Sequence, residues 1–315
     1  MGSRVLVLSA SIGSGHVMAA AALVTAFAAR SDVDEVASID ALQGSSEVFR
    51  AFYDDAYFAL VKATPWLVGW GYDANDVPFK LGSSVSLWDR INTSALVREI
   101  LDFAPTVVVC THFLPLRLVA LLLARGSISC SLSAVTTDYD FQGLWLTGVF
   151  TRYFVAREET KDYLVAMGLP EERVTVSGIP VRPELGQPVD RGAVLGRYGL
   201  TADVPTLLIS AGAAGGAYVT SIVNQVKRLR SPVQAVIVCG RSEALRARIS
   251  AQVEGLDHLV VLGYTDDMTD LMRSATLFVG KPGGLSSSEC MAAGLPMVLV
   301  SPIPGQEVRN SDFLL

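Results

Sequence analysis

Short aliphatic and β-branched runs alternate with helical patterns of hydrophobic residues along most of the chain. In the first half, apolar runs predict strands at residues 5–9, 36–39, 106–110, 132–136, 149–155 and 173–177. The spacing of apolar residues between these runs predicts helices at residues 19–30, 116–124 and 158–167. Short strands separated by helices are typical of a parallel, doubly wound sheet.

A stretch rich in glycine and proline interrupts this alternation near the middle of the chain. It opens at Gly178 and Pro180 and continues to Pro205. The alternation then restarts, with strands predicted at residues 206–210, 235–239, 259–262, 277–279 and 297–300 and helices near 218–230, 243–253 and 286–293. We therefore expect two α/β domains of similar build, residues 1–180 and residues 181–315, with the Gly/Pro stretch as their linker.

Composition and charge exclude several classes of protein. Half of the 315 residues are hydrophobic and 18% are charged, which excludes disordered and low-complexity chains. The formal net charge of −6 argues against a general nucleic-acid binder, which needs a basic face. The four cysteines form no C-x-x-C pair, so zinc ribbons and dithiol redox motifs are excluded and buried thiols in a reducing compartment are expected.

Three segments bear on contact with a membrane. Residues 106–124, the most apolar long stretch, are interrupted by His112, Pro115 and Arg117, so they predict a strand, a turn and a helix instead of a membrane span. The N-terminus passes directly into a strand, and we expect no secretory signal there. Residues 47–88 hold ten aromatic residues, which indicates either a helical insertion packed on the core or a surface that meets lipid.

The first glycine-bearing loop, residues 9–16, lies between a predicted strand and a predicted helix. It carries Gly13 and Gly15, but Met18 stands where the dinucleotide fingerprint has its third glycine, which argues against a nicotinamide site. His16 falls at the start of the helix, where the helix dipole disfavours the imidazolium form. A neutral His16 facing a cleft can act as a general base; the alternative is a histidine that caps or packs locally.

Two further glycine-rich loops follow strands of the second half. Residues 210–216 include Gly212 and lack the Lys-Ser/Thr pair of a P-loop, although a phosphate or sugar can approach such a backbone closely. Residues 280–289 read Gly-Lys-Pro-Gly-Gly-Leu-Ser-Ser-Ser-Glu, and their amides and hydroxyls at a helix start suit a diphosphate. Glu289, about one turn into that helix, can accept hydrogen bonds from ribose hydroxyls or can serve only as a cap.

Weaker candidates lie at other predicted strand ends. His112 follows the strand at residues 106–110, at a cleft edge of an open α/β sheet, as either a supporting site residue or a structural histidine. Asp138 begins a D-x-D string, but we expect it to orient a histidine or an acceptor, or to end a strand, and we expect no metal site. Gln306 and Glu307 place an amide and a carboxylate side by side, where they can read sugar hydroxyls.

Taken in order, these motifs resemble those of the family of monogalactosyldiacylglycerol synthases and diacylglycerol glucosyltransferases. More distantly, they are similar to the transferase that adds N-acetylglucosamine to peptidoglycan lipid precursors. No single motif is specific, but their combination and order are, and the resemblance covers essentially the whole chain. It rests on Gly13-Ser14-Gly15-His16, Thr137-Asp138 with Trp145, Val176-Ser177-Gly178-Ile179-Pro180-Val181, residues 280–289 and Pro304-Gly305-Gln306-Glu307.

The resemblance implies a GT-B architecture, in which two Rossmann-like domains face each other across a cleft. It implies a transferase that moves a hexose from a UDP-sugar to a diacylglycerol-type lipid. We expect this transferase to be metal-independent and inverting, to need no other cofactor, and to attach peripherally to the cytoplasmic face of the cell membrane. His16 is then the catalytic base, with Gly15, His112 and Asp138 on the acceptor side. The residues implied for the UDP-sugar are Gly212, Gly240, Tyr264, Gly283, Gly284, Leu285, Ser286, Glu289, Gln306 and Glu307.

Two departures from the family pattern leave other functions open. Some members carry an acidic residue just before the first glycine loop, where this chain has Ser11. Family members usually continue for tens of residues past the position of Leu315, so we expect the second domain to lack its C-terminal end. The alternatives are a UDP-sugar epimerase of the same fold, which needs no lipid surface, and a protein that binds a nucleotide sugar without catalysis.

Overall fold

The computed structural model describes residues 2–11, 14–43, 94–212, 216 and 218–315. The chain divides into two compact units, and each contains a parallel sheet. Unit 1 consists of Met1–Pro180 together with Pro304–Leu315, and unit 2 consists of Val181–Ile303. The expected ranges placed residues 304–315 in the second domain, whereas this segment packs with unit 1.

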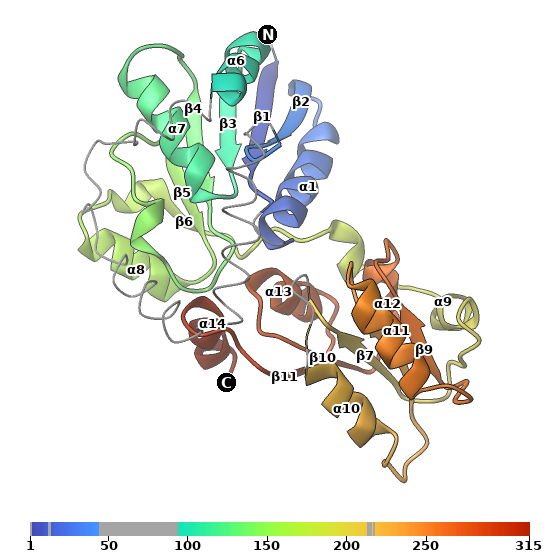
Figure 1. Cartoon of the computed structure of the whole chain (residues 1–315). Helices are drawn as coiled ribbons and strands as arrows, with labels where there is room; N and C mark the ends of the chain where they lie inside the picture. The colour runs from blue at the N-terminus through green and yellow to red at the C-terminus, as the bar shows by residue number, and fades with distance from the viewer. Residues whose placement is uncertain (1, 12–13, 44–93, 213–215, 217) are drawn as a thin grey trace. The chain divides into compact units, whose positions relative to one another are not determined.

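Unit 1 is built on a six-stranded sheet in the order β2-β1-β3-β4-β5-β6 (Figure 1). Its strands are β1 (Ser3–Ser9), β2 (Val33–Asp40), β3 (Val107–Cys110), β4 (Ser131–Val135), β5 (Arg152–Val155) and β6 (Val174–Val176). Among the described residues, its helices are α1 (Gly15–Ala28), α6 (Ser94–Phe103), α7 (Phe113–Ala124), α8 (Glu158–Ala166) and α14 (Gln306–Leu314), with short 3-10 turns η2 (Gly143–Trp145) and η3 (Glu171–Arg173).

Alternate residues of the central strands of unit 1 enter two different cores, as expected for a sheet covered on both faces. Leu6 and Leu8 of β1 pack with residues of α6, α7 and α8 in the larger core. Val5 and Val7 pack with Ala20 of α1 on the other face. The strands are parallel, so their carboxyl ends meet at one edge of the sheet, which is where open α/β sheets bind ligands.

Unit 2 repeats this build with a five-stranded sheet in the order β11-β10-β7-β8-β9. Its strands are β7 (Thr206–Ser210), β8 (Gln234–Val238), β9 (Leu259–Leu262), β10 (Leu277–Gly280) and β11 (Met297–Leu299). One face is covered by α10 (Tyr218–Val226) and α11 (Glu243–Gln252). The other face is covered by α9 (Arg191–Gly196), α12 (Met268–Ser274), α13 (Gly284–Ala292) and the 3-10 turn η4 (Pro183–Gly186).

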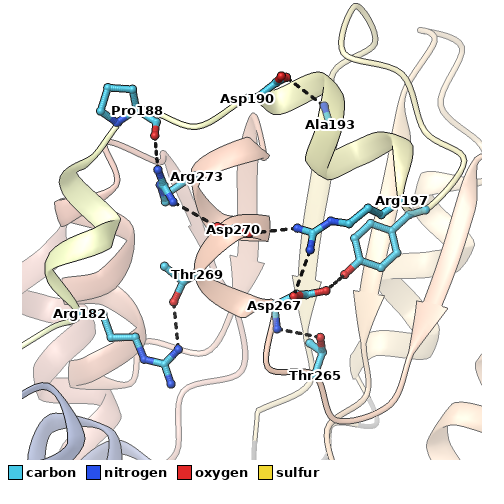
Figure 2. Close-up of polar contacts among 11 residues, drawn as sticks. Arg182, Pro188, Asp190, Ala193, Arg197, Thr265, Asp267, Thr269, Asp270 and Arg273 are labelled. Carbon is cyan, nitrogen blue, oxygen red and sulfur yellow. Dashed lines mark hydrogen bonds and ion pairs between the residues drawn. The ribbon is translucent and has the colours of Figure 1, made fainter. Parts of the chain in front are cut away.

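The stretch expected as a linker is an ordered part of unit 2. Figure 2 shows that residues 182–198 are fastened to α12 by a series of polar contacts. Arg273 donates to the carbonyls of Gln187 and Pro188, and Asp270 pairs with both Arg273 and Arg197. Its glycines and prolines predicted a loop, but Leu185 and Leu195 are buried in the core, so the segment folds as η4 and α9.

The predicted alternation of strands and helices is confirmed in both units, with three differences besides α9. Residues 149–151 precede β5 instead of opening it, because the loop before it is tied down by a bond from the Thr147 amide to the Tyr153 hydroxyl. Helices α6 and α12 were not predicted; α12 has only seven residues, too few to show a clear period. All four cysteines are free thiols, and Cys110, Cys239 and Cys290 are buried as expected.

The aromatic segment at residues 47–88 lies outside the described residues, so its two interpretations stay open. In the part of the chain that the structure describes, we find no helix long and apolar enough to cross a membrane.

Candidate functional site

His16 of unit 1 lies where the carboxyl ends of β1, β3 and β4 come together. It is the second residue of α1, which follows β1, while Thr111 follows β3 and Thr137 follows β4 by two residues. The Thr111 hydroxyl donates to the His16 carbonyl over 2.9 Å, which ties the start of α1 to the end of β3. Three segments far apart in sequence thus hold one imidazole.

The contacts of the His16 ring determine where its proton sits. Nδ1 lies 2.8 Å from the carbonyl oxygen of Thr111 and 2.8 Å from Oγ1 of Thr137. A carbonyl oxygen can only accept, so Nδ1 must carry the hydrogen, and the Thr137 hydroxyl shares it as a second acceptor. The neutral ring then has an unprotonated Nε2, which is the form that can take a proton from a substrate.

His112 stands beside His16 with its own proton placed by a different contact. It is the N-cap of α7, and its Nδ1 accepts a hydrogen bond from the Leu114 amide over 3.1 Å. The two imidazoles meet edge to face, with ring centroids 4.6 Å apart and planes at 88°. Trp145 lies near both rings, at centroid distances of 6.5 Å from His16 and 6.4 Å from His112.

Burial keeps both histidines neutral at physiological pH. Burial lowers the pKa of His16 to about 4, although the bond to the Thr111 carbonyl opposes this. Burial also holds the pKa of His112 well below its ordinary value, and the neighbouring His16 adds to that effect. A neutral His16 is what the sequence led us to expect, but desolvation is its main cause.

Asp138 belongs to a polar network that fastens α14 to unit 1. Gln306 and Asn310, both on α14, donate side-chain hydrogen bonds to the two oxygens of the Asp138 carboxylate. Asn310 is completely buried, and its Oδ1 accepts from the Tyr139 amide over 3.1 Å. Burial raises the pKa of Asp138 to about 6, and the two amide donors oppose the rise.

An ion pair and an aromatic contact also hold α14 against the segment at residues 139–140. Arg309 of α14 pairs with Asp140 at 2.7 Å, and the ring of Phe313 stacks on Tyr139 at a centroid distance of 4.5 Å. Both carboxylates of the D-x-D string, those of Asp138 and Asp140, therefore bind side chains of α14. In the described residues, no three His, Cys, Asp or Glu side chains lie close enough to hold a metal ion.

In unit 2, Gly212 and Gly240 bring two loops close together. They follow β7 and β8, and both have positive φ, +70° and +61°. A Cβ atom on Gly240 would lie 3.2 Å from the carbonyl oxygen of Gly212, so a side chain there would strain the backbone as well as crowd the neighbouring loop. Glycine at both positions keeps this edge of the sheet open to a ligand's approach.

The loop after β10 ends at a helix start that presents main-chain amides. Gly283 is the N-cap of α13 and has no side chain to bond the amides of the first turn, among them those of Leu285 and Ser286. The Ser287 and Ser288 hydroxyls donate to the carbonyls of Gly283 and Gly284, so they are engaged within the helix. The anion-binding capacity of this turn therefore lies in its amides and in the helix dipole.

Glu289 is a desolvated carboxyl for which the described residues supply no hydrogen-bond donor. Burial raises the pKa of Glu289 to about 7, and the positive charge of Arg182 counters part of that rise. The Arg182 guanidinium lies 3.5 Å from the Thr269 hydroxyl at the beginning of the ordered Gly/Pro stretch (Figure 2). The residue is partly buried, so its carboxylate is poorly solvated, and a ligand that donates hydrogen bonds would offset that cost.

Tyr264 lies on the surface of unit 2 in the turn after β9. It is 62% exposed, and the Arg241 guanidinium lies 5.4 Å from its ring centroid, next to Gly240. The arrangement offers a flat aromatic face and a cation to a planar ring.

The structure thus brings the sequence candidates together in two groups. Unit 1 holds Gly15, His16, His112, Asp138 and Gln306, while unit 2 holds Gly212, Gly240, Tyr264, residues 283–286 and Glu289. Glu307 lies on α14 in unit 1, and its assignment and that of Gln306 to the UDP-sugar stay predictions. The sequence analysis did not identify Thr111, Asn310 or Arg182 as site residues. Thr111 precedes His112 and Arg182 lies within the Gly/Pro stretch, but no motif in the sequence indicated a role for either.

Two α/β units, each built on a parallel sheet, are also found in proteins of known structure. The chain matches MurG of Acinetobacter baumannii with a TM-score of 0.56 and 17% identity, covering 99% of this chain and 83% of that one. It matches MnaA of S. aureus, solved with UDP, with a TM-score of 0.61 and 11% identity, covering 95% and 79% of the two chains. At these identities the likeness concerns the fold, which is that of GT-B proteins, as expected.

Sequence comparison identifies the family within that class. A family model described as monogalactosyldiacylglycerol synthase matches residues 16–181, more than half of the chain, and one described as the glycosyltransferase family 28 C-terminal domain matches residues 206–310. The protein belongs to the monogalactosyldiacylglycerol synthase family, which confirms the resemblance seen in its motifs.

Named relatives agree with this assignment. The processive diacylglycerol β-glucosyltransferase of Staphylococcus saprophyticus is 33% identical over 224 residues, which is 69% of this chain and 56% of the relative. That of Staphylococcus haemolyticus is 34% identical over 219 residues, with the same coverage of both chains. The chain therefore spans a little over half the length of the curated relatives it matches.

Proposed function

We propose that this protein is a glycosyltransferase that moves a hexose from a UDP-sugar to a diacylglycerol-type lipid. The substrate class follows from the family and from the relatives named as diacylglycerol β-glucosyltransferases. The observation that carries the chemistry is the His16 ring, neutral and with Nδ1–H held by the Thr111 carbonyl. Such a ring offers its Nε2 lone pair to an acceptor hydroxyl.

In the proposed reaction, the acceptor oxygen attacks the anomeric carbon while its proton passes to Nε2 of His16. The bond between the anomeric carbon and the diphosphate oxygen breaks on the opposite side, so the anomeric configuration inverts and UDP leaves with the bonding pair. The amides at the start of α13 stabilise the departing negative charge, and no metal or further cofactor takes part in this proposal.

We propose that the nucleotide of the donor binds to unit 2. Its diphosphate lies on the first turn of α13, its ribose hydroxyls donate to Glu289, and its uracil lies by Tyr264. Arg182 adds positive charge near the same carboxyl, where it also favours an anionic ligand.

A lipid substrate requires access to a membrane surface, and we propose that the protein attaches there peripherally on the cytoplasmic side. Binding to vesicles that contain diacylglycerol tests this directly, with vesicles lacking it as the control. Binding to neither would contradict the peripheral attachment.

The function itself is tested by incubating the protein with UDP-glucose, UDP-galactose or UDP-N-acetylglucosamine together with dioctanoylglycerol, followed by mass spectrometry of the lipids. A hexosyl lipid is the expected product. Release of an epimerised sugar without acceptor would favour the epimerase alternative. UDP binding without any product would favour a non-catalytic binding protein.

A further inference from the structure

The two histidines of unit 1 carry their protons on different nitrogens. At His16 the carbonyl of Thr111 requires a hydrogen on Nδ1. At His112 the amide of Leu114 donates to Nδ1, so that atom must be unprotonated, and the hydrogen of the neutral ring resides on Nε2. Because both rings are neutral, one Nε2 is an acceptor and the other is a donor.

No hydrogen bond from the Nε2–H of His112 to a described residue is found, and although the residue as a whole is only 2% exposed, Nε2 is not one of the fully buried side-chain atoms that lack a partner. The Nε2–H therefore lies at the small accessible part of this residue, where water or a ligand can supply its acceptor. Its surroundings are otherwise aromatic: the ring of Phe113 lies 4.3 Å away and that of Trp145 lies 6.4 Å away, centroid to centroid.

The position of His112 is fixed by contacts that do not involve its Nε2. The residue is extended, with φ of −144° and ψ of 147°, and its Nδ1 caps α7. Capping alone is performed by asparagine, serine or aspartate at least as well. A histidine at this position therefore adds an N–H donor that lies farther from the backbone than the amide or hydroxyl of those residues.

We propose that His112 binds the lipid acceptor by donating its Nε2–H to a second oxygen of the head group, beside the hydroxyl whose proton His16 removes. This deepens the proposed function and rests on it. The class of acceptor it selects carries two neighbouring oxygens, such as a glycerol ester or a glycosyl head group. Simple alcohols with one oxygen lack the second contact.

Two variants separate the cap from the donor, because an asparagine side chain reproduces Nδ1 and a glutamine side chain reproduces Nε2. H112N keeps an acceptor for the Leu114 amide but loses the donor, so its stability should stay near that of the wild type. H112Q loses the cap and retains a donor, so it should be the less stable protein and the better enzyme.

We expect H112N to raise KM for dioctanoylglycerol about tenfold, the scale of one hydrogen bond, with UDP affinity unchanged. The preference of the wild type for dioctanoylglycerol over octanol should shrink by a similar factor in H112N and be partly retained in H112Q. A histidine that only caps α7 predicts the reverse order of the two variants in activity. Unchanged acceptor kinetics in H112N would overturn the proposal.

The protonation states can be measured without any turnover. In the ¹⁵N-labelled protein, the imidazole nitrogen shifts should show a protonated Nδ1 for His16 and a protonated Nε2 for His112, and dioctanoylglycerol should move the His112 Nε2–H signal downfield. A proton on Nδ1 of His112, or no response to dioctanoylglycerol, would contradict the inference. If dioctanoylglycerol moves that signal but no sugar is transferred, the proposed function fails and the acceptor contact stands.

Discussion

The His16 site of unit 1 and the Glu289 site of unit 2 differ in whether the protein supplies hydrogen-bond partners for the group that we propose to react or to bind. Around His16, a carbonyl and a hydroxyl fix the imidazole, and Asp138 has a donor for each oxygen. Glu289 has no such donor among the described residues, and burial raises its pKa to about 7. The fold thus holds the proposed catalytic base in place, whereas the proposed ribose ligand Glu289 has no hydrogen-bond donor until a ligand supplies one.

The largest expected effect is at the preorganised group. H16A should lower kcat by about 10²–10⁴-fold, the usual contribution of a general base, while UDP binds as before because unit 2 is untouched. Single-turnover measurements and UDP calorimetry check this, with H258A, an exposed histidine of unit 2, as the matched control. Turnover of H16A within a few-fold of the wild type would show that His16 is not the base.

The second-largest expected effect comes from removal of the Glu289 carboxyl, which lacks hydrogen-bond donors among the described residues. E289A should weaken UDP binding by about ten- to a hundredfold, since hydrogen bonds to a charged group contribute about 1.5–3 kcal/mol. Calorimetry measures the affinity, and E254A changes an exposed glutamate of the same unit as a control. If both variants bind UDP equally well, Glu289 does not contact the nucleotide.

The raised pKa of Glu289 also makes binding sensitive to pH. Near pH 6 the free carboxyl is mostly protonated, because burial has raised its pKa to about 7, and it must lose that proton to accept bonds from the ribose. UDP affinity should therefore increase as the pH rises through 7. At pH 6, binding of UDP should release a proton from Glu289, which the buffer takes up. Calorimetry in two buffers of different ionisation enthalpy measures this proton, and E289Q should remove that contribution.

The smallest effect tests the second contact on His16. T137V removes the hydroxyl near Nδ1 but leaves the Thr111 carbonyl, so kcat should fall only about two- to tenfold. T136V, at a buried threonine one residue earlier whose hydroxyl is directed at the Phe154 carbonyl, should leave kcat close to the wild type. Equal losses in both variants would indicate a general packing effect.

Much of this arrangement follows from local sequence. Apolar runs separated by helical patterns predicted the strands of both sheets, and parallel strands place their carboxyl ends at one edge. His16 and His112 each follow a predicted strand, so their presence at the same edge could be expected. That they touch could not, because it depends on the register between β1 and β3.

The parts of the candidate site that the sequence did not predict depend on contacts between distant segments. The pairing of Asp138 with Gln306 and Asn310 joins residues more than 160 positions apart, and no periodicity in either segment reveals it. Arg182 reaches the vicinity of Glu289 only because the Gly/Pro stretch folds onto α12, which its composition argued against.

The attachment of α14 also has a consequence for biosynthesis. Unit 1 includes Pro304–Leu315, so it is interrupted in sequence by the whole of unit 2. A ribosome must translate Val181–Ile303 before the amides of Gln306 and Asn310 exist to meet Asp138. A nascent chain paused before residue 304 therefore carries an incomplete first unit, and a chaperone that shields this surface would act at that stage of translation.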